Sequence, residues 1–175
     1  VKLFKAEKGV LLSVDNKTWI TNGLPEGTVK LNYGAIFENY FPGQDTSTAG
    51  FVIDWNGKIT YTVRDPSKPI STVYYSDGTS KGTFSIPPPA GLAVLNSNPD
   101  FIYSSILGVA NNKLIIQYNN SIFSFNDETK SLVKLVDIST KNSIIELITQ
   151  RRDNGLYFRR HGEDSYFLFT DGTQA

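Results

Sequence analysis

The chain has 175 residues, in which 17 lysine and arginine residues balance 17 aspartate and glutamate residues. This zero net charge gives no electrostatic reason to expect a nucleic acid or an anionic membrane surface as partner. Cysteine is absent and histidine occurs once, which excludes disulfides and thiolate metal sites and argues against a zinc site with several histidines. No apolar run is long enough to span a bilayer, so we expect no membrane insertion.

Short segments rich in β-branched and aromatic residues recur along the whole chain. In chain order they are 9–15, 17–21, 58–63, 71–75, 113–118, 121–125, 155–160 and 165–169. Each is bounded by Gly, Asn, Asp or Pro, a pattern typical of antiparallel strands joined by tight turns. The pairs Asn56-Gly57 and Asn111-Asn112 suit the positive φ of two-residue hairpins. The segment 143–152 has some helical character, but its β-branched residues favour a strand.

Four segments of the chain are similar to one another and indicate a repeat. Each contains three predicted strands, then a polar turn and a fourth strand, and the third strand carries an aromatic residue, namely Trp19, Tyr75, Phe123 or Phe167. The polar turns recur at intervals of about 44 to 55 residues, close to the length of a four-stranded propeller blade. We expect the four aromatic residues to pack between blades.

The repeat predicts an all-β fold, a β-propeller of four-stranded antiparallel blades that forms a single domain or a fragment of one. The units are about 1–33, 50–88, 101–139 and 143–175, and the last ends where its outer strand should begin. We expect either further sequence of a longer parent protein or another chain, adding a strand, to complete that blade.

The polar turn also carries a family resemblance. The sequence Ser76-Asp77-Gly78-Thr79, followed by Gly82-Thr83, resembles the ELWxSDGTxxGT repeat of secreted and surface propeller proteins of bacteria. The first unit keeps Trp19, Gly23 and Gly27-Thr28, and the fourth keeps Thr170 to Thr173. The third unit has Asn126-Asp127-Glu128-Thr129 and lacks both glycines, and the Glu-Leu pair is missing throughout. The resemblance implies a surface, adhesion or scaffold module.

Repetition of the acidic residue in these turns favours a structural role over catalysis, because a catalytic group is needed once and a turn is needed in every blade. An aspartate that opens a turn accepts a hydrogen bond from the backbone two residues on, and the following glycine adopts positive φ. The turn motif comprises Asn22, Gly23, Asp77, Gly78, Thr79, Gly82, Thr83, Asp127, Asp171, Gly172 and Thr173. No calcium-loop motif is present, and we expect no catalytic residue, metal or cofactor.

Candidate ligand-binding residues lie outside the repeated turn. Trp55, in the turn that follows the first strand of its unit, is expected to be exposed and able to stack on a sugar. Arg151, Arg152, Arg159 and Arg160 flank one predicted hairpin and could grip a carboxylate or a phosphate, although a solvated hairpin is the simpler interpretation. The long variable segments 32–50, 65–70 and 87–100 are further candidates, because binding residues concentrate on loops.

These patterns predict a non-enzymatic scaffold or binding module of a secreted or cell-surface bacterial protein, with a protein or glycan partner held by loops at the blade edges. The alternative is a sialidase-like glycoside hydrolase. It rests on the hairpin arginines and on Ser13 to Trp19 (SVDNKTW), which is similar to the Asp-box of sialidase propellers but one residue short and without its glycine.

Overall fold

The structure, a computed structural model, describes residues 1–36, 52–64, 71–92, 104–119, 121–137, 144–150, 155–161 and 166–173. It is built from antiparallel strands, which confirms the predicted all-β class. The first sheet contains β1 (Lys2–Ala6), β2 (Gly9–Val14), β3 (Lys17–Thr21) and β4 (Val29–Tyr33), with a 3₁₀ turn, η1 (Pro25–Gly27), before β4. The third sheet has the same order, with β10 (Ser104–Ala110), β11 (Lys113–Tyr118), β12 (Ser121–Asn126) and β13 (Ser131–Asp137).

The second and fourth sheets vary this plan. The second contains β6 (Val52–Trp55), β7 (Lys58–Arg64), β8 (Ser71–Ser76) and β9 (Thr83–Ile86), and the two-residue strand β5 (Ala35–Ile36) also pairs with β7. Three strands of the fourth sheet are described, namely β14 (Ile144–Gln150), β15 (Leu156–His161) and β16 (Tyr166–Thr170). The strand β14 confirms the extended interpretation of segment 143–152.

The prediction that a loop begins at residue 32 is wrong, because β4 extends to Tyr33 and the short strand β5 follows it. Gly34 adopts a φ of 102°, a left-handed value that lets the chain turn between the two strands. Its backbone is fixed on both sides, since its N–H donates to the Asn16 carbonyl at 2.7 Å and its carbonyl accepts from the Thr18 hydroxyl at 3.0 Å. A strand of two residues is too short to produce a period-2 pattern.

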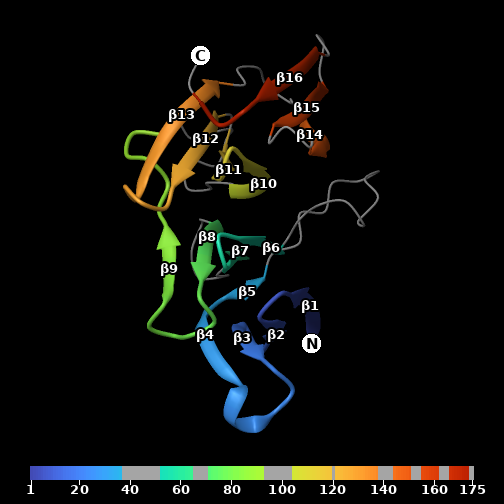
Figure 1. The fold of residues 1–175 in the computed structure, drawn as a ribbon, viewed down its shortest axis with the longest axis vertical. Helices are drawn as coiled ribbons and strands as arrows, with labels where there is room; N and C mark the ends of the chain where they lie inside the picture. The colour runs from blue at the N-terminus through green and yellow to red at the C-terminus, as the bar shows by residue number, and fades with distance from the viewer. Residues whose placement is uncertain are drawn as a thin grey trace.

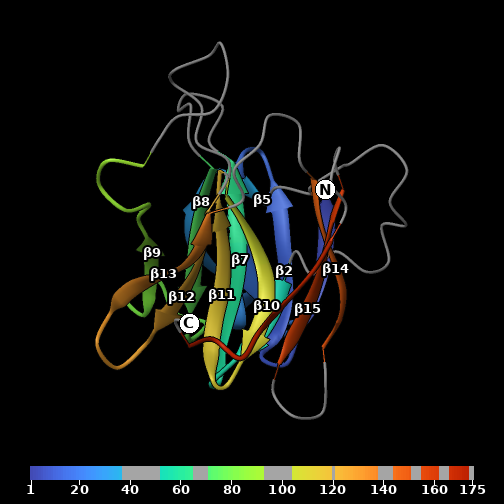
Figure 2. The ribbon, with the colours of Figure 1, turned by 90° about the horizontal axis from the view of Figure 1, so that it is seen from above.

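The four sheets follow one another in chain order along an open arc (Figure 1). The first strands β1, β6, β10 and β14 lie toward the inside of the arc, and β4, β9 and β13 lie toward the outside. Viewed from above, the strands of successive sheets run side by side (Figure 2). The described sheets do not close into a ring.

Three apolar clusters separate the four sheets. The cluster between the first and second sheets includes Leu11 and Ile59, and the cluster between the third and fourth includes Ile115 and Leu156. The largest, between the second and third sheets, is formed by Trp55, Val73, Tyr75, Ile86, Ile106, Leu114, Ile116, Tyr118, Phe123 and Phe125. The sheets therefore form one continuous stack.

Packing on both faces explains why the middle strands are so apolar. Leu114 and Ile116 pack toward the second sheet, whereas Ile115 between them packs toward the fourth. Strand β8 does the same, with Tyr75 in the cluster shared with the third sheet and Tyr74 beside the cluster shared with the first. Successive residues of a strand point to opposite faces, so a sheet covered on both faces needs apolar residues at consecutive positions.

Candidate functional site

The turn between β8 and β9 is closed by the side chain of Asp77. Its Oδ1 accepts hydrogen bonds from the Thr79 amide at 2.8 Å and from the Thr79 hydroxyl at 2.7 Å. These bonds, the one from the Thr79 hydroxyl first, hold the pKa of Asp77 below its usual value. Gly78 takes a φ of 96°. Asp77 is thus engaged with its own turn.

The same arrangement occurs in the first and fourth sheets. Asn22 Oδ1 accepts from the Leu24 amide at 3.0 Å, and Asp171 Oδ1 accepts from the Thr173 amide at 2.9 Å. Asp171 also accepts from the Thr173 hydroxyl, and this bond is the main reason that its pKa is lowered. An uncharged asparagine performs the same role as the two aspartates, so the turn needs an acceptor oxygen rather than a charge.

The second glycine of the motif provides space for the capping side chain. A Cβ placed on Gly82 would lie 2.1 Å from the Asp77 carboxylate, and one placed on Gly27 would lie 2.0 Å from the Asn22 side chain. The spacing of five residues between the capping residue and this glycine is therefore steric in origin. It explains the repeated Gly-Thr without any ligand.

We expect Gly82→Ala to lower the free energy of unfolding by about 1–2 kcal/mol, the usual effect of losing a side-chain cap. The new methyl group displaces the Asp77 carboxylate and breaks its bonds to Thr79. Urea unfolding of Gly82→Ala measures this, with exposed Lys81→Ala as the neutral control. In an Asp77→Gly background the same change should be nearly neutral. An equal loss in both backgrounds would show that the carboxylate is not the obstacle.

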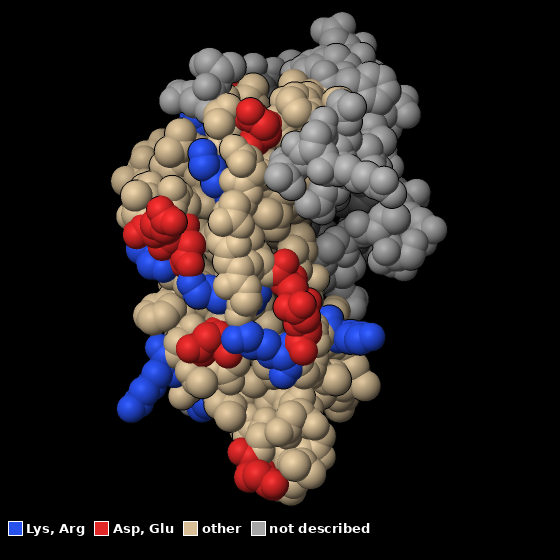
Figure 3. Space-filling view, viewed as in Figure 1, with Lys and Arg blue, Asp and Glu red and all other residues tan. Residues whose placement is uncertain are grey.

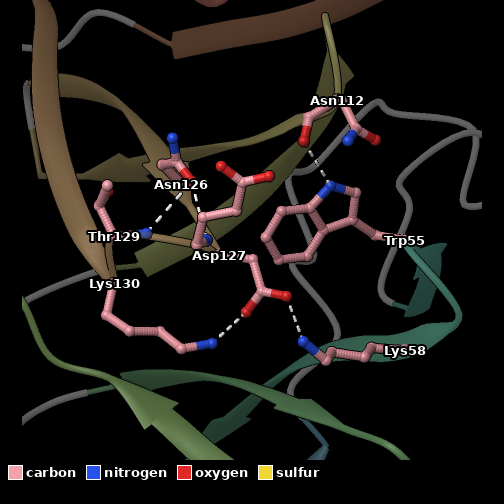
Figure 4. Close-up of polar contacts among 8 residues, drawn as sticks. Trp55, Lys58, Asn112, Asn126, Asp127, Thr129 and Lys130 are labelled. Atoms are coloured by element: carbon pink, nitrogen blue, oxygen red, sulfur yellow. Dashed lines mark hydrogen bonds and ion pairs between the residues drawn. The ribbon is translucent and has the colours of Figure 1, made fainter.

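The third sheet departs from the predicted turn. Asn126, not Asp127, caps it, because Asn126 Oδ1 accepts from the Glu128 amide at 2.8 Å. The expectation that Asp127 caps its own turn is therefore wrong by one residue. Asp127 instead pairs with Lys130 of the same turn and with Lys58 of the second sheet (Figure 4). The sequence alone does not distinguish the two residues, because Asn126 and Asp127 are adjacent and either type can cap a turn.

A lysine at the first hairpin of each of the first three sheets contacts the polar turn of the next sheet. Lys8 Nζ donates to the Asp77 carbonyl at 3.3 Å, and Lys113 Nζ donates to the Gly172 carbonyl at 3.1 Å. Lys58 occupies the corresponding place and pairs with the Asp127 carboxylate. The three junctions between sheets thus share one type of contact, in which a lysine of one sheet binds the polar turn of the next. The sequence signal is a lysine beside the first hairpin turn of the first three repeats, and sequence reasoning missed it.

Asp127 lies at the centre of a polar cluster between the second and third sheets. Its side chain is 18% exposed, that of Lys58 is 25% and that of Lys130 is 55%. Burial alone would raise the pKa of Asp127, but the hydrogen bonds from Lys130 and Lys58 outweigh it and the pKa is lowered. Both ammonium groups also lie over the Tyr75 ring, 5.2 Å from its centroid for Lys58 and 5.1 Å for Lys130.

Trp55 is buried beside this cluster, so the expectation that it is exposed and binds a ligand is wrong. Its side chain is 2% exposed, and its indole N–H donates to the Asn112 carbonyl at 3.0 Å (Figure 4). The ring lies edge-on to Phe125, with centroids 5.9 Å apart. Position in a turn suggested exposure, but Trp55 belongs to the apolar cluster between the second and third sheets.

The four aromatic residues that were predicted to pack between blades differ in their outcome. Tyr75 is buried, and its ring centroid lies 5.8 Å from that of Phe125 in the neighbouring sheet, as expected for packing between sheets. Phe123 is buried in the cluster between the second and third sheets and also lies against Tyr118 of its own sheet, and Trp19 is partly buried. The side chain of Phe167 lies outside the described residues.

The predicted arginine cluster is described only in part. Arg159 and Arg160 lie on β15, opposite Glu146 and Ile145 of β14 and opposite Phe167 and Tyr166 of β16. Arg151 and Arg152 lie outside the described residues, as do segment 65–70 and most of the predicted loops 32–50 and 87–100. On the face seen in Figure 3, acidic and basic residues are interspersed, without a large patch of one sign.

The segment similar to an Asp-box forms the hairpin between β2 and β3. Asp15 and Asn16 take φ values of 48° and 56°, those of a tight two-residue turn. Ser13 and Thr18 are buried and hold the chain between β4 and β5: the Ser13 hydroxyl accepts from the Ile36 amide at 3.2 Å, and the Thr18 hydroxyl donates to the Gly34 carbonyl. These described contacts are structural.

A groove of about 400 Å³ opens between the outer strands of the second and third sheets. It is lined by Tyr75, Phe84, Ser85, Ile86, Pro87, Phe125, Lys130 and Leu132. Phe84 remains 52% exposed. Sequence reasoning missed this site because it combines a strand of one repeat with the turn of the next.

Within the described ranges, no group of three or more His, Asp or Glu side chains is placed to hold a metal ion. The described residues also include no helix long and apolar enough to cross a membrane.

Comparisons with known proteins give little further information. No protein family model matches the chain, and no curated protein matches it. Among solved structures, the tricorn protease aligns with 95% of this chain and 17% of its own, at 13% sequence identity and a TM-score of 0.40. This chain therefore spans a small part of that protein, and the likeness is too weak to carry an argument about fold or function.

Proposed function

We propose that the chain is a β-propeller, or part of one, in which the four sheets are consecutive blades. Its function is that of a non-enzymatic scaffold or binding module of a secreted or cell-surface bacterial protein, with a protein or glycan partner. The order of the sheets, the burial of both faces of the middle sheets and the shared lysine contacts support the architecture.

The observation that favours binding over catalysis is that the polar residues of the motif are already engaged in structural contacts. Asp77, Asp127 and Asp171 are each engaged in a turn or in a contact between sheets. The aromatic groove, in contrast, presents the half-exposed Phe84. A scaffold of stacked sheets with an apolar groove suits recognition of a partner.

A glycan array and a display library of extracellular proteins, both probed with the labelled chain, test this function. We expect at least one specific partner. Replacing segment 37–51 or 93–103 by a Gly-Ser linker of equal length should weaken a partner held by the loops, without lowering the midpoint of thermal unfolding. Failure to bind any glycan or protein would contradict the proposal.

The sialidase-like alternative ranks second, because the described contacts of its Asp-box-like segment are structural. Incubation with a fluorogenic sialoside separates the two functions. The binding module should give no turnover above buffer. Turnover that Arg159→Ala or Arg160→Ala abolishes would instead establish the hydrolase.

A further inference from the structure

The groove between the second and third sheets has a preformed aromatic wall. The Phe84 ring lies 5.6 Å from the Tyr75 ring, which in turn lies 5.8 Å from the Phe125 ring. Tyr75 and Phe125 are each 4% exposed, whereas Phe84 is 52% exposed. An exposed ring supported by buried rings keeps its position and offers apolar surface to a ligand at little entropic cost.

The strand that borders this groove pairs on one edge only, as far as the described residues show. Among the described strands, β9 pairs with β8 alone, and it lies at the outside of the molecule in both ribbon views (Figures 1 and 2). The Asp77 amide donates to the Gly82 carbonyl at 3.2 Å, which fixes the alternation of the ladder. Phe84 and Ile86 therefore bond toward β8, and the backbone groups of Ser85 point away from it.

This edge lacks the charges that usually protect edge strands from pairing. The sequence of β9 is Thr-Phe-Ser-Ile, whereas the outer strand β13 carries Lys134 and Asp137, and β4 carries Lys30. Charged residues on an edge strand discourage the addition of another strand. The described outer strands thus include one, β9, that is free of charge and adjacent to an apolar groove.

The groove also borders the ammonium group of a lysine. Lys58 and Lys130 share the single carboxylate of Asp127. Lys130 lines the groove, and its side chain is 55% exposed. An anionic group on a ligand would meet this lysine.

We infer that the groove binds an extended peptide segment of a partner protein, which adds as a strand to β9, places a large apolar side chain against Phe84 and presents a carboxylate to Lys130. This inference rests on the proposed binding function and names a site distinct from the loops. Tyr75, Ser85 and Lys130 supply the polar side-chain groups of the described lining. A glycan would need more directed hydrogen-bonding groups, whereas a peptide strand obtains its hydrogen bonds from the backbone of β9.

The test is a titration of the ¹⁵N-labelled chain with a synthetic peptide of seven residues, with phenylalanine third, glutamate fifth and threonine elsewhere. The two special residues lie on one face of a strand. We expect amide shifts centred on β9 and a Kd of the order of 100 µM, typical of a short interface. Phe84→Ala should weaken binding at least tenfold, and Lys130→Gln should weaken it only while the glutamate is present.

Phe169→Ala is the matched control. Phe169 is also 52% exposed, and its ring lies 4.8 Å from Tyr157 of the adjacent strand, but it belongs to β16. Its removal should leave the affinity unchanged. Ser85→Pro removes an outward N–H and should abolish binding, while urea unfolding verifies that the variant still folds.

Four results would overturn the inference. The first is no shift in β9 at 1 mM peptide, and the second is equal weakening by Phe84→Ala and Phe169→Ala. The third is an acidic oligosaccharide that shifts the β9 amides when the peptide does not. That last result leaves the binding function intact and rejects the peptide. The fourth is a partner that no longer binds after loop replacement but binds the Phe84→Ala variant normally. That result rejects the groove as the binding site and leaves the proposed binding function intact.

Discussion

Trp55→Ala should lower the free energy of unfolding by about 3–5 kcal/mol, the usual range for removing a large buried aromatic side chain. The indole fills the space between the second and third sheets, is 2% exposed and packs edge-on against Phe125. Its loss also leaves the Asn112 carbonyl without its donor. Equilibrium unfolding in urea, followed by far-UV circular dichroism, measures the change.

Trp55→Phe is the control that separates the two contributions. It keeps a ring in the space and loses the indole N–H, so we expect a smaller loss of about 1–3 kcal/mol. If Trp55→Ala costs under about 1 kcal/mol, as exposed side chains usually do, Trp55 is not buried between the sheets. The residue would then return to the set of candidate ligand contacts.

Asp127→Ala should lower the free energy of unfolding by about 1–3 kcal/mol. This lies between the values for exposed and buried ion pairs, because Asp127 is 18% exposed and its two lysines are more exposed. Without the carboxylate, two ammonium groups remain over the Tyr75 ring and repel each other. The matched control is Asp137→Ala, which removes an ion pair with the 51% exposed Lys134 at 2.6 Å and a hydrogen bond from the Ser121 hydroxyl. We expect about 0.5 kcal/mol there, and equal costs for both variants would contradict the account.

The Asp127 contacts also predict a dependence on pH. The pKa of Asp127 is lower in the folded chain than in the unfolded chain, so its contribution is fully present above the unfolded value near 4. The contribution is lost as pH falls through the lower, folded value. The difference in unfolding free energy between the wild type and Asp127→Ala should therefore be constant from pH 7 to 5 and shrink below about pH 4. A difference that grows on acidification would reverse the sign and refute the assignment.

The sequence supports the prediction of the sheets because their signals are local. Alternating β-branched and aromatic residues, bounded by turns such as Asn56-Gly57 and Asn111-Asn112, define hairpins without reference to the rest of the chain. The capped turns at Asp77 and Asp171 are also local, since the acceptor and the donors lie within a few residues. Strand β5 escaped prediction because two residues carry no period.

The candidate site could not be predicted in the same way, because it depends on contacts between repeats. Trp55 lies in a turn by sequence, yet the packing of the third sheet buries it. Asp127 lies in an aligned turn, yet Lys58, distant in sequence, determines its role. The groove joins Phe84 of one repeat to Lys130 of the next. Such pairings follow from the order of the sheets, and no short motif encodes them.

The central claim is that structural residues join the second and third sheets into one unit and leave the outer groove for binding. Hydrogen exchange of the Trp55 indole N–H is its most direct test. We predict that this proton exchanges only through global unfolding, with a free energy of opening equal to that of the slowest amides of β11. Exchange at the rate of an exposed indole, while the β11 amides stay protected, would show that the two sheets separate and would contradict the account.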